Sequence, residues 1–149
     1  MAGAIDGTRK YLKTQIQTAS REQLVLMLYD GAIRFSEQAK DRLASRDYDG
    51  AHGLLIRAQN IVLELLYALD RKTGGEIAEK LSGLYTYCYS RLIEANVYHQ
   101  PERVDESSNV LRDLREAWAK AIEILKQNPQ GTGSGSTSPA AAGGVNAAG

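Results

Sequence analysis

The chain has 149 residues, of which 43% are hydrophobic and 24% charged, which suits one domain with its own core. Its 18 acidic residues balance 18 basic ones, so no excess charge favours nucleic acid or an anionic membrane. A single cysteine, Cys88, excludes an intramolecular disulfide framework and suits a reducing compartment. The opening residues hold no apolar run of signal-peptide length, and no run approaches the roughly 20 residues that cross a bilayer. We therefore expect a cytoplasmic protein without membrane insertion.

Residues 1–19 form a short, weakly amphipathic segment ahead of the main helical pattern. The first long helix is expected to open at Ser20, because Gln23 follows at the spacing of a capping box, and to continue to about Leu43. Its apolar residues lie on two adjacent stripes at helical spacing. The first stripe contains Leu24, Leu28, Ala32, Phe35 and Ala39, and the second contains Val25, Tyr29 and Ile33.

Three more helices are predicted along the chain. The second runs from about Tyr48 to Leu69 and ends before the turn-like DRKTGG. The third opens with a second capping box at Thr73 and Glu76 and extends to about Val97, with Gly74 and Gly75 serving the turn into it. Its core stripe contains Ile77, Leu81, Leu84, Cys88, Leu92 and Ala95. The fourth begins near Pro101, which suits a first helical turn, and ends at Asn128 before Pro129.

No alternating run of β-branched residues between turns appears, so the fold class is all-α. Helices of this length joined by short links predict an antiparallel up-down four-helix bundle over residues 20–128. Residues 129–149 are rich in Gly, Ser and Ala and lack large apolar side chains, which predicts a disordered tail.

The helices carry more apolar residues than one stripe each requires. Several of the additional residues are tyrosines, whose apolar body and polar tip suit a surface that is exposed in one state and covered in another. We therefore predict a hydrophobic groove, although a wide core would place up to half of these residues in the interior instead. The candidates are Val25, Tyr29, Ile33, Ile56, Leu63, Tyr67, Tyr85, Tyr89 and Ile93, with Asn96 as a helix cap or a contact for a bound chain.

The residues that carry chemistry are few. Two histidines and one cysteine cannot complete a structural zinc site, and the expected core stripes contain no carboxylates for a di-metal centre. His52 superficially resembles the start of a histidine phosphotransfer motif, but no lysine follows where that motif places one, so a solvated histidine near a helix start is the better interpretation. Cys88 lies on a core stripe and is expected to be a packed thiol. We expect no catalytic residues, no metal, no cofactor and no enzyme activity.

Several stretches, in this order and spacing, resemble the FliS family of flagellar secretion chaperones. They are TASREQL, LMLYDGAIRF, GGEIAEKLSGLYTY, RLIEAN and LREAWAKAI, and the resemblance covers about Lys10 to Ile122. The family often has proline where this chain has Arg21, a change that should alter helix capping only.

The resemblance implies a four-helix bundle that binds the C-terminal region of flagellin in a hydrophobic groove in the cytoplasm. It also implies that binding prevents premature polymerisation and that the client passes to the flagellar export apparatus for type III secretion. The N-terminal segment is then a cap on the groove, formed by Ile5, Tyr11, Leu12 and Ile16. The alternative is a structural or regulatory bundle whose additional apolar surface is a homodimer interface.

Overall fold

The structure is a computed structural model that describes residues 7, 9–14 and 18–127, and these contain helices and short connections without a β-strand. The all-helical fold class is therefore confirmed. None of the described helices is long and apolar enough to cross a bilayer. The predicted disordered tail, 129–149, lies outside the described residues. The long helices are α2 (Arg21–Ala44), α3 (Tyr48–Tyr67), α4 (Arg71–Tyr98) and α5 (Pro101–Gln127).

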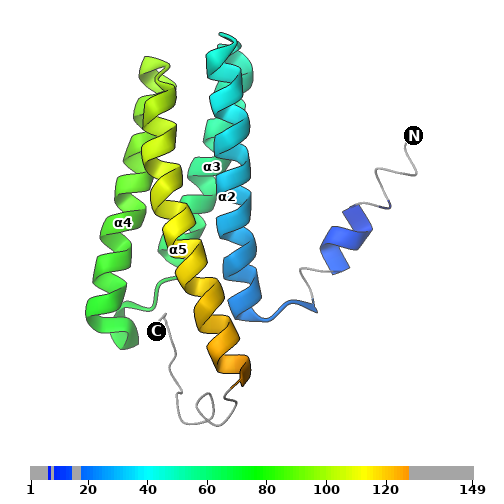
Figure 1. The fold of residues 1–149 in the computed structure, drawn as a ribbon, viewed down its shortest axis with the longest axis vertical. Helices are drawn as coiled ribbons and strands as arrows, with labels where there is room; N and C mark the ends of the chain where they lie inside the picture. The colour runs from blue at the N-terminus through cyan, green and yellow to red at the C-terminus, as the bar shows by residue number, and fades with distance from the viewer. Residues whose placement is uncertain (1–6, 8, 15–17, 128–149) are drawn as a thin grey trace.

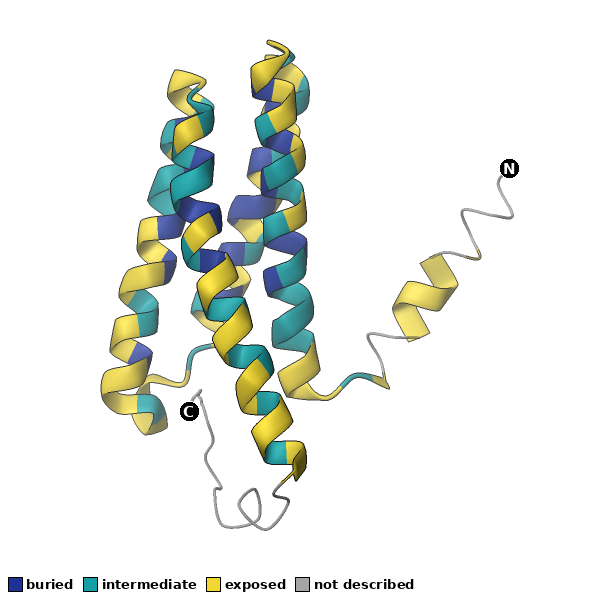
Figure 2. Ribbon diagram, viewed as in Figure 1, coloured by how far each residue is buried: buried dark blue, intermediate teal, exposed yellow. Residues whose placement is uncertain are grey.

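The four long helices pack side by side in a closed ring. Both α2 and α4 contact α3 on one side and α5 on the other. Short connections at residues 45–47, 68–70 and 99–100 make consecutive helices run in opposite directions, as Figure 1 shows. The buried residues line the inside of this ring, and exposed residues cover its outside (Figure 2).

The start of α2 agrees with the sequence prediction. Ser20 is the residue before the helix, and its side chain accepts a hydrogen bond from the Gln23 backbone N–H at 3.2 Å. The Ser20 backbone N–H in turn donates to the Gln23 side-chain oxygen at 3.3 Å. Two amides that the helix itself cannot pair are thus satisfied, and the predicted capping box is confirmed.

The predicted start of the third helix was wrong. Asp70 caps α4, and its carboxylate accepts hydrogen bonds from the backbone N–H groups of Lys72 and Thr73 at 3.1 and 3.2 Å. The Thr73 hydroxyl donates to the same carboxylate, and these bonds, the hydroxyl's first, hold the pKa of Asp70 below its ordinary value. Aspartate is a strong N-cap, so the helix begins before the threonine that we expected to cap it.

Gly74 and Gly75 therefore lie inside α4 rather than in a turn before it. Gly75 has φ 53° and ψ −129°, which breaks the helical path and kinks α4 after its first turn. Residues with a side chain rarely adopt this conformation, so glycine is required at this position for a conformational reason. The kink separates the Asp70-capped turn from the long straight part of α4.

One hydrophobic core fills the ring. It contains Tyr29, Ala32, Ala39, Leu43, Ala51, Leu55, Ala58, Val62, Leu65, Tyr85, Cys88, Leu92, Ala95, Val104 and Leu111. The most deeply buried large residue of α2 is thus Tyr29, which belongs to the second of the two predicted stripes. Leu28 and Phe35, from the first stripe, are only partly buried and pack against the core. In α4 the predicted stripe was wrong at Ile77 and Leu84, which are exposed; Ala78 and Tyr85 are buried instead.

Two tyrosines meet in the middle of this core. The phenolic oxygens of Tyr29 and Tyr85 lie 2.5 Å apart in a buried hydrogen bond, and their ring centroids are 6.3 Å apart. Burial raises the pKa of Tyr29 well above its ordinary value and that of Tyr85 to about 12. Both hydroxyls therefore stay neutral, each providing the partner that the other requires away from water.

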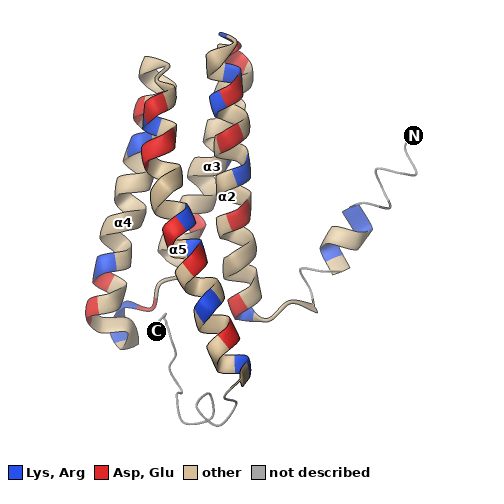
Figure 3. Ribbon diagram, viewed as in Figure 1, with Lys and Arg blue, Asp and Glu red and all other residues tan. Residues whose placement is uncertain are grey.

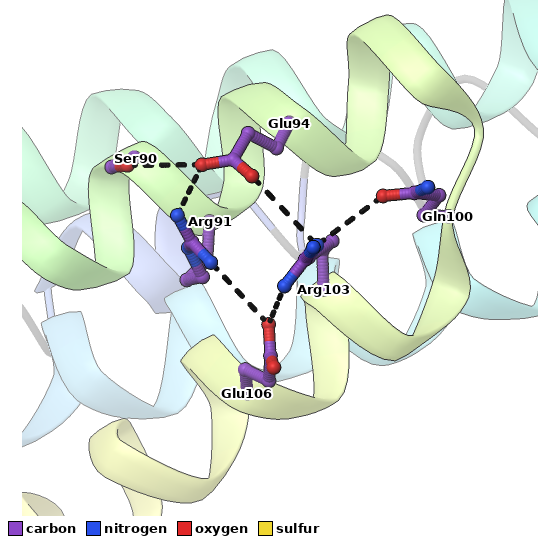
Figure 4. A network of polar contacts seen from close by, with 6 residues as sticks. All are labelled: Ser90, Arg91, Glu94, Gln100, Arg103 and Glu106. Atoms are coloured by element: carbon purple, nitrogen blue, oxygen red, sulfur yellow. Dashed lines mark hydrogen bonds and ion pairs between the residues drawn. The ribbon is translucent and has the colours of Figure 1, made fainter.

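Interhelical ion pairs occur on both sides of α5. Toward α2 they join Lys40 to Asp105 at 2.8 Å, Arg112 to Glu37 at 2.5 Å and Arg115 to Asp30 at 2.6 Å. Toward α4, a network formed by Arg91, Glu94, Arg103 and Glu106 crosses between the two helices (Figure 4). Figure 3 shows acidic and basic residues along α5 and its neighbours. Within the described chain, no ion pair joins α3 to α4.

We expect the effects of substituting Tyr29 and Tyr85 on the free energy of unfolding to be non-additive. Tyr29→Phe or Tyr85→Phe alone leaves a buried hydroxyl without its partner and should lower the free energy of unfolding by about 1–3 kcal/mol. The double variant removes both hydroxyls and should lose less than the sum of the two single changes. Urea unfolding of the four proteins measures this coupling. Tyr87→Phe, at an exposed position of α4, is the control, and strictly additive losses would contradict the pairing.

Stability should also fall in alkali. Burial raises the pKa of Cys88 to about 11 from 9.0 and that of Tyr85 to about 12 from 10.0. The unfolded chain therefore loses these protons at a lower pH than the folded chain. The stabilisation is complete below pH about 9 and is lost progressively as the pH rises toward about 12. Urea midpoints measured from pH 8 upward should fall beyond pH about 9, and less steeply in Cys88→Ala. Midpoints that do not change would contradict the burial of these groups.

Candidate functional site

A hydrogen bond between α3 and α4 fixes how their facing flanks align. His52 near the start of α3 and Asn96 near the end of α4 are joined by a 2.8 Å bond between the imidazole Nδ1 and the side-chain amide nitrogen. The helices are antiparallel, so moving forward along α3 from His52 corresponds to moving backward along α4 from Asn96. This register identifies the residues that flank the contact between the two helices.

Apolar residues continue along both flanks from this bond. Steps of one or two helical turns from His52 and Asn96 lead to side chains on the same flank of each helix. Ile56 and Ile93 are 37% and 39% exposed, and Tyr67 is 75% exposed at the far end. The α3–α4 strip, as we call it, consists of Ile56, Leu63 and Tyr67 from α3 and Tyr89 and Ile93 from α4.

The strip combines apolar area with an absence of charge. Leu63 and Tyr89 are half-buried, and Tyr89 packs against the edge of the core. The strip's polar atoms beyond the backbone are the hydroxyls of its two tyrosines, an arrangement that suits alternate contact with water and with another chain. Large apolar side chains left partly exposed in a row are typical of a surface that binds another protein segment.

The structure divides the residues that we predicted for a groove into three groups. The first group lies on the facing flanks of α3 and α4 and consists of Ile56, Leu63, Tyr67, Tyr89, Ile93 and Asn96. Val25 and Ile33 of α2 are half-buried against the core. Tyr29 and Tyr85 are each 2% exposed and are joined by a hydrogen bond. These two residues therefore belong to the core, as the wide-core alternative predicted, and not to a groove. A bound chain has no access to these two rings while the helices remain packed.

The predicted N-terminal cap falls mostly beyond what the structure covers. Ile5 and Ile16 lie outside the described residues. Tyr11 and Leu12 belong to the helical residues 9–14 and are 69% and 47% exposed. Their contact with a groove stays a prediction.

The structure confirms that His52 is exposed near a helix start, but sequence reasoning missed the contact that it makes. Its ring nitrogen forms a hydrogen bond with the Asn96 side chain, and the pair marks one end of the strip. At the same end the ring of Tyr48 stacks on His99, with centroids 3.8 Å apart and planes 5° apart. His99 terminates α4 in the left-handed conformation. Nothing in the local sequence signals these contacts, because each joins residues from different helices.

Exposed apolar residues also lie on the other flank of α4. Ile77, Leu84 and Tyr87 are exposed there, and the guanidinium of Arg91 lies 5.4 Å from the Tyr87 ring centroid. Arg91 also pairs with Glu106 of α5, which identifies this flank as the one toward α5. The two flanks of α4 therefore differ: ion pairs accompany the apolar residues on the α5 side and are absent on the α3 side of the described chain.

Comparison with known proteins identifies the family. The model of the family described as "Flagellar protein FliS" matches residues 4–125. The flagellar secretion chaperone FliS of Bacillus subtilis is 32% identical over 123 residues, which cover 83% of this chain and 91% of the relative. The flagellar secretion chaperone FliS of Campylobacter jejuni is 37% identical over 108 residues, covering 72% of this chain and 84% of the relative.

A solved structure shares the fold. The crystal structure of a flagellar chaperone from bacteria superposes with a TM-score of 0.66 at 20% sequence identity, covering 81% of this chain and 98% of the other. The family itself follows from the match over residues 4–125 and from the identities with the two relatives. The chain belongs to the FliS family, a family of flagellar secretion chaperones and not of enzymes.

Proposed function

We propose that this protein is a cytoplasmic export chaperone that binds the C-terminal region of flagellin on the α3–α4 strip of an antiparallel four-helix bundle. Binding covers a client segment that would otherwise pack against other flagellin copies, so it prevents premature polymerisation. The chaperone then delivers the client to the type III flagellar export apparatus. The observation that carries the proposal is the uncharged, partly exposed strip alongside α3 and α4.

The strip has the physical properties that such a client requires. An unfolded segment that orders on binding loses conformational entropy, so it needs a long row of apolar contacts in compensation. Covering a fully exposed Ile, Leu or Phe contributes about 1.5–3 kcal/mol, and the partly buried residues of the strip contribute a share of that each. An amphipathic client segment would place its own apolar face along this row and keep its polar face in water.

The distribution of ion pairs also favours the α3–α4 side of the bundle as the client site. The pairs on both sides of α5 hold that helix to α2 and α4. The flanks of α3 and α4 meet instead through apolar contacts and the His52–Asn96 bond. Side chains on these flanks can repack around a client without separating charges, and the Asn96 amide is placed to exchange its histidine partner for client backbone.

Charges introduced into the strip should abolish much of the client affinity. Ile56→Asp and Ile93→Asp each force a carboxylate against the apolar face of the client, and each should weaken binding at least about tenfold. The measurement is isothermal titration calorimetry with a synthetic peptide of the C-terminal region of flagellin. Circular dichroism verifies that both variants keep their helices.

Two matched variants locate the effect. Ile124→Asp changes an exposed isoleucine of α5, away from the strip, and should leave the affinity unchanged. Ile77→Asp tests the opposite flank of α4. If Ile77→Asp weakened binding and the strip variants did not, the client site would lie between α4 and α5, and our assignment would be wrong.

The N-terminal segment should compete with the client. We propose that Ile5, Tyr11, Leu12 and Ile16 occupy part of the strip in the free chaperone. A competing lid lowers the apparent affinity in proportion to the time that it covers the site. A chain that starts at Thr18 should therefore bind the flagellin peptide about threefold or more tightly than the full chain. Equal affinities would show that the segment is no lid.

The homodimer alternative makes a different prediction. If the strip joined two copies of the chain, size-exclusion chromatography with light scattering would show a stable dimer that fails to bind the peptide. We expect instead a monomer that forms a complex with it. In that experiment Ile56→Asp should leave the mass of the free protein unchanged.

A further inference from the structure

The flank of α3 that faces α2 carries a second surface feature, an open cleft of about 540 Å³. Asp41 and Arg42 line it from α2, and Asp49, Gly53 and Arg57 line it from α3. Its size is within the usual range of ligand sites, roughly 300–1,000 Å³. We call it the α2–α3 cleft.

Arg57, which lines one end of the cleft, shares an aromatic ring with Arg34 of α2. The guanidinium carbon of Arg57 lies 5.6 Å from the centroid of the Phe35 ring, and that of Arg34 lies 5.2 Å from the same centroid. Neither arginine pairs with a carboxylate anywhere in the described chain. A guanidinium beside an aromatic ring still has N–H donors that can bind a carboxylate. Two like charges beside one ring also repel, and an anion between them relieves that repulsion.

Two carboxylates without ion-pair partners in the described chain lie at the other end. Asp49 precedes Arg57 by eight residues on α3, which is about 12 Å along a helix. Asp41 follows Arg34 by seven residues on the antiparallel α2, so both acids lie at the same end. The remaining ionic groups there are already engaged. Arg42 pairs with Asp47 at 2.7 Å, and Asp47 also accepts the Gly50 backbone N–H at 3.1 Å; these contacts, the backbone bond first, hold the pKa of Asp47 below its ordinary range.

The α3 side of the cleft is bare in its middle, at Gly53, whereas Gln38 lines the opposite side from α2. A Cβ atom added at Gly53 would meet no atom within 4 Å, so no neighbouring side chain covers this position. A second helix can therefore approach the α3 backbone closely between the two charged ends.

From this polarity we infer that the α2–α3 cleft binds a helical segment of a second protein that carries acidic and basic side chains about two turns apart. The acidic side chain contacts Arg34 and Arg57, and the basic side chain contacts Asp41 and Asp49. The site is on the flank of α3 opposite the α3–α4 strip, so this partner and the proposed client can be bound at the same time. Charge complementarity at both ends selects the partner and its orientation.

The test uses a defined probe. It is an acetylated and amidated alanine-based helical peptide with two lysines near one end and two glutamates two turns further along. Titrated into the 15N-labelled full chain, it should shift the amide resonances of Gly50 and Gly53 and the side-chain resonances of Arg34 and Arg57. Peptides of the same length with only lysines or only glutamates should bind at least about fivefold more weakly, because one end of the cleft is then left unpaired or opposed.

Matched substitutions decide whether the cleft is the site. Gly53→Gln fills the bare middle and should weaken probe binding at least about tenfold, whereas Gly83→Gln, at an exposed and equally open helical glycine of α4, should have no effect. Glutamine is a better helix former than glycine, so neither variant should unfold the protein. Equal binding by the two variants, or equal binding of all three peptides, would overturn the inference. Ile56→Asp should bind the probe normally, so failure at the cleft and failure of the proposed client site are distinguishable.

Discussion

The hydroxyl pair of Tyr29 and Tyr85 lies across the centre of the ring, between α2 and α4, which are not neighbours in it. Two large aromatic side chains that meet there set the width of the core. The same core also contains small residues, such as Ala32, Ala58 and Ala95. Because close packing tolerates neither gaps nor overlap, the size of the central pair limits what the remaining helical faces can bury.

This limit explains why α3 and α4 keep apolar side chains near the surface. The interior is occupied by Leu55 and Val62 from α3 and by Tyr85 and Leu92 from α4. The additional apolar residues of these helices therefore lie on their flanks, where they form the α3–α4 strip. The proposed client surface is thus a consequence of a full core, and the chaperone can present it without partial unfolding.

Helix α3 has a different environment on each flank. Toward α4 it presents uncharged apolar residues, and toward α2 it borders a cleft with acidic and basic ends. Contacts with α2 are close, since a Cβ at Gly31 of α2 would lie 3.1 Å from the Ile61 side chain. Ion pairs hold α5 on both of its sides, so the ring has a charge-linked half around α5 and a half around α3 that is free of interhelical ion pairs in the described chain. Both proposed binding surfaces lie in the second half.

The helices themselves follow from local physical chemistry. The 3.6-residue periodicity, the Ser20–Gln23 box and Pro101 each act within a few residues, so their positions along the chain were predictable. The cap of α4 is Asp70 and not Thr73. Both are strong N-cap residues close together in the sequence, and hydrophobic periodicity does not indicate which of them caps the helix.

The sequence alone determined four amphipathic helices, an apolar surplus and a family resemblance. The tertiary structure decided which apolar residues are surplus: it buried Tyr29 and Tyr85 together and left Ile77 and Leu84 outside. It also decided that His52 meets Asn96 and that Arg34 and Arg57 share one ring. Two adjacent apolar stripes on one helix are separated by a small rotation about the helix axis. Only the packing of the neighbouring helices determines which stripe faces the core.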